Sequence, residues 1–358
     1  MRAPRWVVAL EFTELSPAAE GRPLQPLVAP EFTASGLVNP HRNRRTLGSV
    51  HALGVWRMQA LTVAGYQSHL FIGEQRFCGP SIVPAHFEAH VAAGQVLPRD
   101  ALALPERVIQ EPTVVFMGWN ADVYGEALVD MAPRVQIAAR TLGEAPEDLA
   151  FLIASNAPNW FRDLAVRAGA ARFIEYDQAA ERVLLRHALV ATHPAASALH
   201  PALADIFSRM RPRPAPGAGD AVFLTRRQAQ TTRRIQMLNV DEIEAAAEQA
   251  GLRVVAPEQL SLADQAQLFA DARLVAGEYG SALSNAVFCR RNAVIGAIGV
   301  RSARQSAISA LCGLRQSYLD PLGDPEDPTG YHVDVDAFRR WLDALLDAAD
   351  APVAAAMT

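Results

Sequence analysis

Short apolar runs alternate with helical patterns in two parts of the chain, and this alternation limits the fold more than any other feature. In the first part, the runs TVVFMG, LAFLIAS and RFIEY are separated by helical patterns at 123–140 and 159–170. Strands that alternate with helices in this way form βαβ units around a parallel sheet. The sequence therefore predicts an α/β fold.

The second part follows RPRPAPGAGD (211–220), a segment crowded with proline and glycine that is typical of a linker. A helix is predicted at NVDEIEAAAEQAG, with Asn239 as N-cap, Glu242 at the third helical position and Gly251 at the end. The strand candidates around it are AVFLT, RVVAP, RLVAG and AVIGAI, and QSYLD is a candidate for the last strand.

A chain of 358 residues and 38.7 kDa is long for one hydrophobic core, so two domains are expected. The two alternating parts predict two Rossmann-like domains that face a cleft, a GT-B-like arrangement. The predicted divisions are an N-terminal domain at 1–210, the linker at 211–220, a C-terminal domain at 221–330, and a helix and tail at 331–358. The terminal helix is amphipathic, and we expect it to pack on the first half.

The first 110 residues give the weakest signal, and no role is assigned to them. SVHALGVWRMQALTVAGYQSHLFIGEQRFC shows partial alternation, which predicts short strands, and HRNRR (41–45) is interpreted as a solvated loop. The Rossmann-like pattern begins only at about residue 110.

Charge and hydropathy exclude several classes of protein. A net charge of −5 argues against binding to nucleic acid. No apolar run reaches the roughly 20 residues of a membrane-spanning helix, although peripheral membrane association stays open. The N-terminal residues lack the apolar core of a secretory signal. Cysteines 78, 289 and 312 are far apart and are interpreted as buried thiols, so we expect a cytoplasmic protein. The oligomeric state is not indicated.

The chain contains no lysine. P-loop ATPases, protein kinases and Schiff-base enzymes each need a lysine, so these classes are excluded. A bound phosphate would have to be held by arginines, helix N-termini and backbone amides.

The stretch GEYGSALSNAVF (277–288) lies between two apolar runs and contains two glycines. It is either a tight turn or a strand-to-helix loop whose amides receive an anion, and the motif alone leaves both interpretations open. Arg226 and Arg227 end the first strand of the same predicted domain, where a guanidinium can bind phosphate in a bidentate manner. Both are equally explained as surface arginines.

Three other clusters have weaker chemical meaning. HFEAH contains His86 and His90 but lacks the order of the zinc-protease motif, so no metal site is predicted. Asp334 and Asp336 resemble a metal-binding DxD, but they directly precede the last helix and are better explained by helix capping. DPLGDPEDP is interpreted as an acidic loop.

The order of these pieces resembles the catalytic region of glycosyltransferase family 61, the DUF563 group. The resemblance is that of a divergent bacterial member of the family. The resemblance rests on FLTRRQAQTTRRIQMLN, the PEQLSLADQAQLFADA segment and the GEYGSALSNAVF loop, and it covers about 222–298. A weaker resemblance extends to NADVYGEALVDMAPRV upstream.

The resemblance implies a GT-B fold and an inverting transfer of sugar from a nucleotide-sugar donor to a glycan or lipid-linked acceptor, in surface polysaccharide biosynthesis. No required metal or other cofactor is implied. Asp130 would be the general base, with Glu126 beside it as a second candidate catalytic residue. The alternative for Asp130 is a solvated carboxylate on an amphipathic helix. The donor would be bound by Arg226 or Arg227 and by Tyr279, Gly280, Ser281, Leu283, Ser284 and Asn285.

Several features depart from the family pattern, including Ser281 within the loop and a spacing from Arg234 to Asn239 that is one residue longer, and three further positions matter most. Tyr279 and Glu126 each stand where the family has histidine, and Gly296 stands where it has glutamate. These differences motivate an alternative function, a catalytically inactive GT-B paralogue that serves as a binding subunit. A third hypothesis is a protein that binds a nucleotide or phosphosugar without transferring it.

Overall fold

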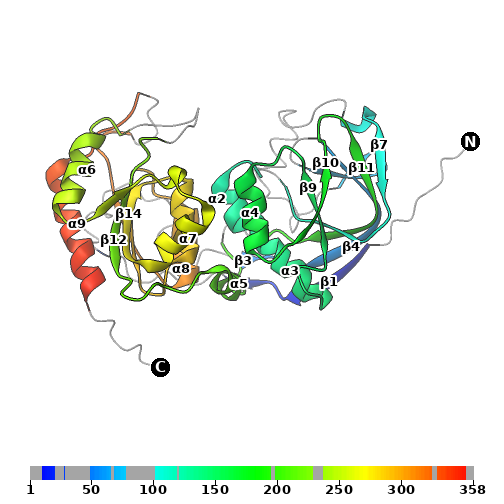
Figure 1. Cartoon of the computed structure of the whole chain (residues 1–358), viewed down its shortest axis with the longest axis horizontal. Coiled ribbons are helices and arrows are strands. Elements are labelled where there is room, and N and C mark those ends of the chain that lie inside the picture. The colour runs from blue at the N-terminus through cyan, green and yellow to red at the C-terminus, as the bar shows by residue number, and fades with distance from the viewer. Residues whose placement is uncertain are drawn as a thin grey trace, which may run out of the picture. The chain divides into compact units, whose positions relative to one another are not determined.

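The computed structural model describes residues 10–20, 28, 49–65, 68–77, 101–118, 121–194, 198–228, 237–324 and 329–351. The HRNRR and HFEAH stretches and Cys78 lie outside the described residues. The chain divides into two compact units (Figure 1). Unit 1 comprises Met1–Glu20 and Ser49–Ile206, and unit 2 comprises Gly21–Gly48 and Phe207–Thr358.

Unit 1 is built on a nine-stranded mixed sheet, in which seven strands follow the order β10-β9-β8-β11-β4-β5-β6. The other two pair beside this row, β1 with β4 and β7 with β11. The strands β8, β9, β10 and β11 are parallel, whereas β4 pairs antiparallel with β11, β5 and β1. The β-strands of this unit are β1 (Leu10–Ser16), β2 (Ala19–Glu20), β3 (Ser49–Val50), β4 (Leu53–Ala64), β5 (His69–Ile72), β6 (Gln75–Arg76), β7 (Glu106–Ile109), β8 (Thr113–Val115), β9 (Ala150–Ala154), β10 (Arg172–Tyr176) and β11 (Arg182–Ala191).

The first half was expected to combine an irregular or β-rich part with a Rossmann-like part from about residue 110, and in the structure both contribute strands to one mixed sheet. Only the segment from β8 to β10 follows the predicted alternation of strand and helix. The expected short strands before residue 78 include β4, which runs for 12 residues, and β11 had no predicted counterpart.

The helix predicted at 123–140 is present but changes its winding in the middle. It consists of α2 (Tyr124–Glu126), the π-helical turn η3 (Ala127–Met131) and α3 (Ala132–Leu142). Pro133 has no N–H to donate to the carbonyl four residues earlier, and the Ala132 amide donates five residues back, to Ala127. The other helices of the first half are η2 (Ala101–Ala103), α4 (Asn159–Arg167) and α5 (Leu203–Met210), which contains the division between the units.

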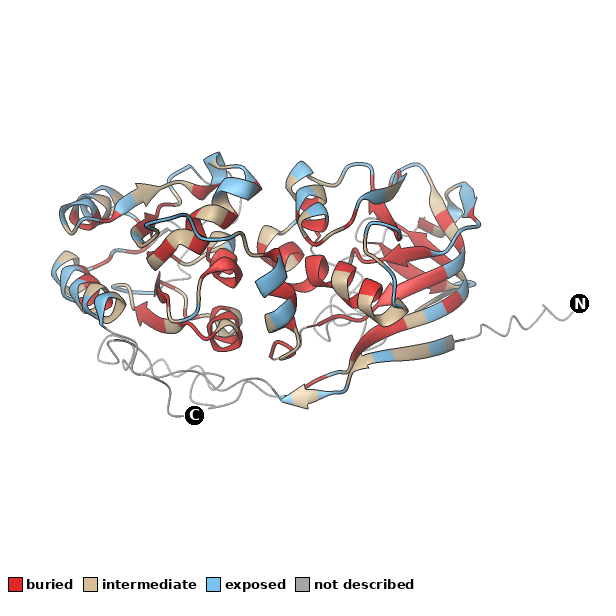
Figure 2. Ribbon diagram, turned by 60° about the horizontal axis from the view of Figure 1, so that its bottom comes forward, coloured by how far each residue is buried: buried red, intermediate tan, exposed pale blue. Residues whose placement is uncertain are grey.

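Unit 2 contains a parallel sheet formed by the five predicted strand candidates, and the structure gives the order β13-β12-β14-β15-β16. The helices α6 and α9 cover one face, and α7 and α8 lie on the other (Figure 1). The elements are β12 (Asp220–Leu224), α6 (Val240–Gln249), β13 (Arg253–Val255), η4 (Pro257–Gln259), α7 (Leu262–Asp271), β14 (Ala272–Glu278), η5 (Ser281–Phe288), β15 (Val294–Ile298), α8 (Ala303–Cys312), β16 (Arg315–Leu319) and α9 (Val335–Asp350). In Figure 2 the strands of the sheet are largely buried.

The terminal helix α9 belongs to the core of unit 2, which corrects the expectation that it packs on the first half. Its Phe338 ring lies edge-on to Phe223 of β12, with 5.8 Å between the ring centroids. A Cβ on Gly296 would lie 2.7 Å from the Trp341 ring, so the glycine makes room for this helix. Asp334 Oδ1 accepts from the Ala337 amide at 2.7 Å, which confirms the capping interpretation of the first aspartate in DVD.

Two local expectations in unit 2 are wrong. Asn239 precedes α6, but its side chain makes no capping hydrogen bond. Instead its amide both donates to the Val333 carbonyl (2.8 Å) and accepts from the Val333 amide (3.0 Å), which ties α6 to the segment before α9. Cys289 is buried as expected, but Cys312 is only partly buried.

Among the described residues, no helix is long and apolar enough to cross a membrane.

Candidate functional site

The parallel sheet of unit 2 reverses its winding between β12 and β14. From β12 the chain passes through α6 to β13 on one side, whereas from β14 it passes through η5 to β15 on the other. In open α/β sheets, ligands bind beyond the carboxyl ends of the strands at such a switch point. The residues that follow Leu224 and Glu278 are therefore the first place to look for a ligand site.

Each glycine of the GEYG stretch leaves room for a different neighbour that a side chain would meet. A Cβ on Gly277 would lie 2.6 Å from the Leu224 carbonyl oxygen, so this glycine allows β14 to approach β12 closely. Gly280 has φ 175° and ψ 177°, an extended conformation that any residue adopts. Its reason is Arg226, since a Cβ there would lie 2.9 Å from the Arg226 Nε. The stretch is thus a strand-to-helix loop and not a turn that needs a left-handed glycine.

Arg226 lies across this loop at the switch point. Its NH1 donates to the Tyr279 carbonyl oxygen (2.7 Å) and to the Glu278 carboxylate (3.3 Å). The Arg226 side chain keeps 23 % of its surface exposed, whereas the Glu278 side chain keeps 5 %. Among the described residues, the Nε and NH2 groups of Arg226 have no hydrogen-bond acceptor. That edge of the guanidinium has the geometry for a bidentate contact with phosphate.

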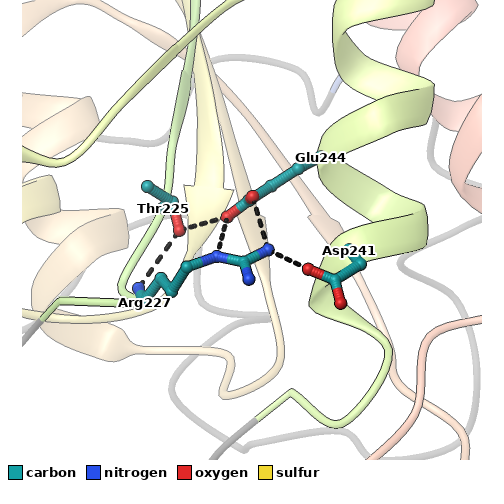
Figure 3. Close-up of polar contacts among 4 residues, drawn as sticks. All are labelled: Thr225, Arg227, Asp241 and Glu244. Atoms are coloured by element: carbon teal, nitrogen blue, oxygen red, sulfur yellow. Dashed lines mark hydrogen bonds and ion pairs between the residues drawn. The ribbon is translucent and has the colours of Figure 1, made fainter.

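The side chain of Arg227 is bound instead by carboxylates of α6 (Figure 3). Its NH2 donates to the carboxylate of Glu244 at 2.7 Å and also to that of Asp241, and its backbone amide donates to Thr225. The hydrogen bonds to Glu244 and Asp241 raise the pKa of Arg227 further above its ordinary value. Of the two arginines left open by the sequence, only Arg226 lies beside Gly280.

The first turn of η5 presents backbone donors at the same place. The Leu283 amide donates to the Gly280 carbonyl at 3.0 Å, whereas the Ser281 and Ala282 amides donate to no acceptor among the described residues. Such amides attract anions because they carry the partial positive charge of a helix start. Leu283, Ser284 and Asn285 follow with buried side chains, and Asn285 donates to Gln265 of α7 at 2.9 Å. These three residues support the loop and present no side chain at the surface.

Tyr279 is directed toward the start of α8. Its hydroxyl donates to Ser302 Oγ at 2.9 Å, and that oxygen accepts from the Gln305 amide as the N-cap of α8. A tyrosine in this position supplies an aromatic ring and a hydroxyl but no cation. The cation beside this loop is therefore Arg226 and not residue 279.

In unit 1 the predicted base, Asp130, is buried within the π-helical turn and is only 3 % exposed, so the alternative of a solvated carboxylate is wrong. Its Oδ2 lies 3.7 Å from the Nε2 of His193, which follows the carboxyl end of β11. Both side chains are almost fully enclosed, at 4 % and 6 % exposure. Glu126, four residues before Asp130, is half-buried.

A buried cation completes this cluster. Arg134 donates through Nε to the Asp130 carbonyl (3.1 Å) and through NH1 to the Phe116 and Met117 carbonyls at 3.4 Å, at the exit of β8. Burial lowers the pKa of Arg134 to about 10, and the charge of Asp130 opposes that shift. A carboxylate, a guanidinium and an imidazole thus share one enclosed site, a combination that is costly to bury and is frequent at functional sites.

Three candidate residues were missed by the sequence reasoning. Arg134 belongs to the NADVYGEALVDMAPRV segment but was given no role, because only the structure shows that it is buried beside Asp130. His193 stands two residues beyond β11, and this strand had no predicted counterpart, so nothing marked the histidine as a strand-end residue. Glu278 is part of the GEYG stretch but was given no role, because only the structure shows its contact with Arg226. Among the described residues, no cluster of His, Cys, Asp or Glu has the arrangement of a metal site.

Residues 124–296 match the model of a protein family described as Glycosyltransferase 61. The matched segment is a little under half of the chain, begins at α2 and ends within β15, so it includes both the Asp130 cluster and the switch point of unit 2. The match supports a glycosyltransferase, and hence a transferase enzyme that uses a nucleotide-sugar donor and a glycan acceptor. No curated protein matches the chain.

Proposed function

We propose that the chain is an inverting glycosyltransferase whose donor diphosphate binds at the switch point of unit 2. The observation that carries this proposal is Arg226, which lies over Gly280 with its Nε–NH2 edge unused by the described residues, within the segment that matches the family. The Ser281 and Ala282 amides provide further donors for the same anion. Arg226 and these amides stabilise the leaving diphosphate, so no metal is required.

The acceptor is activated at the Asp130 cluster of unit 1. The acceptor oxygen forms a bond with the anomeric carbon of the sugar while the bond from that carbon to the diphosphate oxygen breaks on the opposite face. The proton of the acceptor hydroxyl passes to the Asp130–His193 pair, which acts as the general base. This division of roles corresponds to a GT-B fold, with the acceptor on one unit and the donor on the other.

The proposed acceptor is a glycan or its lipid-linked precursor, in the synthesis of a surface polysaccharide in a bacterial cytoplasm. This part of the proposal rests on the family alone. A transfer assay tests the proposal: the purified protein is incubated with UDP-, GDP-, CMP- and TDP-linked sugars, and nucleotide release is followed. Release that depends on both Arg226 and an added acceptor supports it, and no release from any donor contradicts it.

A second function, an inactive paralogue that serves as a binding subunit, is favoured by two positions. The hydroxyl of Tyr279 donates a hydrogen bond to Ser302, so this residue does not replace the histidine of the family pattern. Gly296 makes room for the Trp341 ring and has no side chain to replace the glutamate. The two functions differ in one measurement. A binding subunit takes up a nucleotide but neither transfers nor hydrolyses its sugar, whereas the enzyme does at least one of these.

A further inference from the structure

We propose that Glu278 competes with the donor diphosphate for Arg226 and thereby promotes release of the nucleotide product. This inference rests on the proposed function, because it concerns the same switch-point site. Glu278 is the last residue of β14, its side chain is 5 % exposed, and its Oε1 lies 3.3 Å from the Arg226 NH1. It acts through Arg226 and is therefore a positioning residue.

Different contacts of Arg226 fix the position of its guanidinium and balance its charge. NH1 is fixed from two sides, by the neutral Tyr279 carbonyl at 2.7 Å and by the Glu278 carboxylate. The Nε–NH2 edge has no acceptor among the described residues, and the Nε, Cζ and Cδ atoms of the side chain lie over Gly280. If Glu278 lost its charge but kept its shape, the Tyr279 carbonyl would still hold the guanidinium in place. The carboxylate therefore mainly alters how strongly Arg226 attracts a further anion.

The charge balance gives the carboxylate a function in the reaction cycle. Before a ligand binds, Arg226 and Glu278 neutralise each other, so an arriving diphosphate shares a cation that already has a carboxylate partner. When the sugar leaves, the broken bond gives the nucleoside diphosphate one more negative charge than the intact donor carried. The product therefore gains more from Arg226 than the donor does, and the competing carboxylate weakens product binding more than donor binding. This bias favours release after transfer.

The test is the isosteric substitution Glu278→Gln, with Glu244→Gln as its matched control. Glu244 also binds an arginine near the end of β12, but its partner Arg227 is directed to α6. The probes are UDP, GDP, CDP, TDP and inorganic pyrophosphate, titrated by calorimetry, with dissociation rates from stopped-flow measurements. Both substitutions are repeated in an Arg226→Ala background, and circular dichroism checks that each variant folds.

We expect Glu278→Gln to bind the preferred nucleoside diphosphate at least about threefold tighter, because Arg226 no longer shares its charge with a carboxylate, and to release it correspondingly more slowly. Glu244→Gln should stay within about twofold of wild type, because the carboxylate of Glu244 binds Arg227 and not Arg226. The affinity for the matching nucleotide-sugar should rise less than that for the diphosphate. Without Arg226 the gain should disappear.

The inference is overturned if the wild type binds a nucleoside diphosphate but Glu278→Gln binds it no tighter. It is also overturned if Glu244→Gln gives the same gain, or if the gain persists without Arg226. In these cases the proposed function stands. If no probe and no nucleotide-sugar binds to wild type or to any variant, the proposed function itself fails, and the inference fails with it.

Discussion

At the scale of single residues, Gly280 and Arg226 form one steric unit. A Cβ on Gly280 would lie 2.9 Å from Nε and 3.0 Å from Cζ of Arg226, which belong to a movable side chain. Gly280→Ala should therefore displace the guanidinium and weaken nucleotide binding several-fold, while the free energy of unfolding changes by less than about 1 kcal/mol, because the extended backbone suits alanine. Calorimetry and urea unfolding measure the two effects.

The matching control is the same substitution in an Arg226→Ala protein. If the glycine acts through Arg226, Gly280→Ala has no further effect on binding there, because the two changes share one mechanism. A large loss of stability with intact binding would show that the loop is only a structural turn.

Asp130 has a stabilising role that is separable from its chemistry. The carboxylate is the near charge that opposes the lowering of the Arg134 pKa by burial. Asp130→Asn should destabilise the protein by about 3 kcal/mol, because it leaves a buried cation without its counter-charge. Glu126→Gln, at a half-buried site four residues earlier, should cost less than about 1 kcal/mol. Denaturant unfolding of the two variants makes the comparison.

If Asp130→Asn and Glu126→Gln lost the same free energy of unfolding, the stabilising role of Asp130 beside the buried Arg134 would be contradicted. If Asp130→Asn stays folded, donor binding in unit 2 should persist while transfer falls at least about 100-fold, the range expected for loss of a general base. His193→Gln should reduce the turnover rate without changing donor affinity.

At the scale of secondary structure, α9 can pack on the sheet because residue 296 is a glycine. A Cβ on Gly296 of β15 would lie 2.6 Å from Leu345 Cδ1 and 2.7 Å from the Trp341 ring, and both partners are fully buried. Gly296→Ala should therefore destabilise unit 2 by about 1–3 kcal/mol through overpacking. Gly219→Ala is the control, since its Cβ would meet only Arg290 at 3.8 Å. Equal unfolding midpoints for the two variants would refute this account.

The elements that the sequence predicted are those whose pattern is set locally. The strands of the parallel sheet in unit 2 are short apolar runs between helical segments, so their order along the chain was readable. The strand β11 was missed because Arg186 and His187 interrupt its apolar run, and it is recognisable only from its pairing with β4. The π-helical turn could be located only in the structure, although Pro133 marks a helix that lacks one donor.

The candidate site was predicted only in part, for a similar reason. The sequence placed arginines and a glycine loop at strand ends on the same edge of the sheet, because parallel strands share one carboxyl edge. It could not choose between Arg226 and Arg227, since that choice depends on the carboxylates of α6. It also could not show that Asp130 is enclosed with His193, because the histidine follows a strand far along the chain.

At the scale of the whole molecule, the proposed function assigns the acceptor chemistry and the donor site to two different compact units. The segment that matches the glycosyltransferase family starts in unit 1 and ends in unit 2, and the proposed enzyme uses residues of both. The donor-binding half of the proposal nevertheless depends only on contacts within unit 2. It can therefore be tested by binding alone, without knowledge of the acceptor.

The most direct test of the central claim is a calorimetric titration of wild type, Arg226→Ala and Arg227→Ala with the nucleotide-sugar that gives the largest thermal shift in a screen of UDP-, GDP-, CMP- and TDP-linked sugars. The account predicts that Arg226→Ala loses at least about tenfold in affinity, the value of a charge-assisted contact. Arg227→Ala should stay within about twofold of wild type, because this arginine is held by Glu244 and Asp241. Equal affinities of all three proteins, or a loss confined to Arg227→Ala, would contradict the assignment of the donor site.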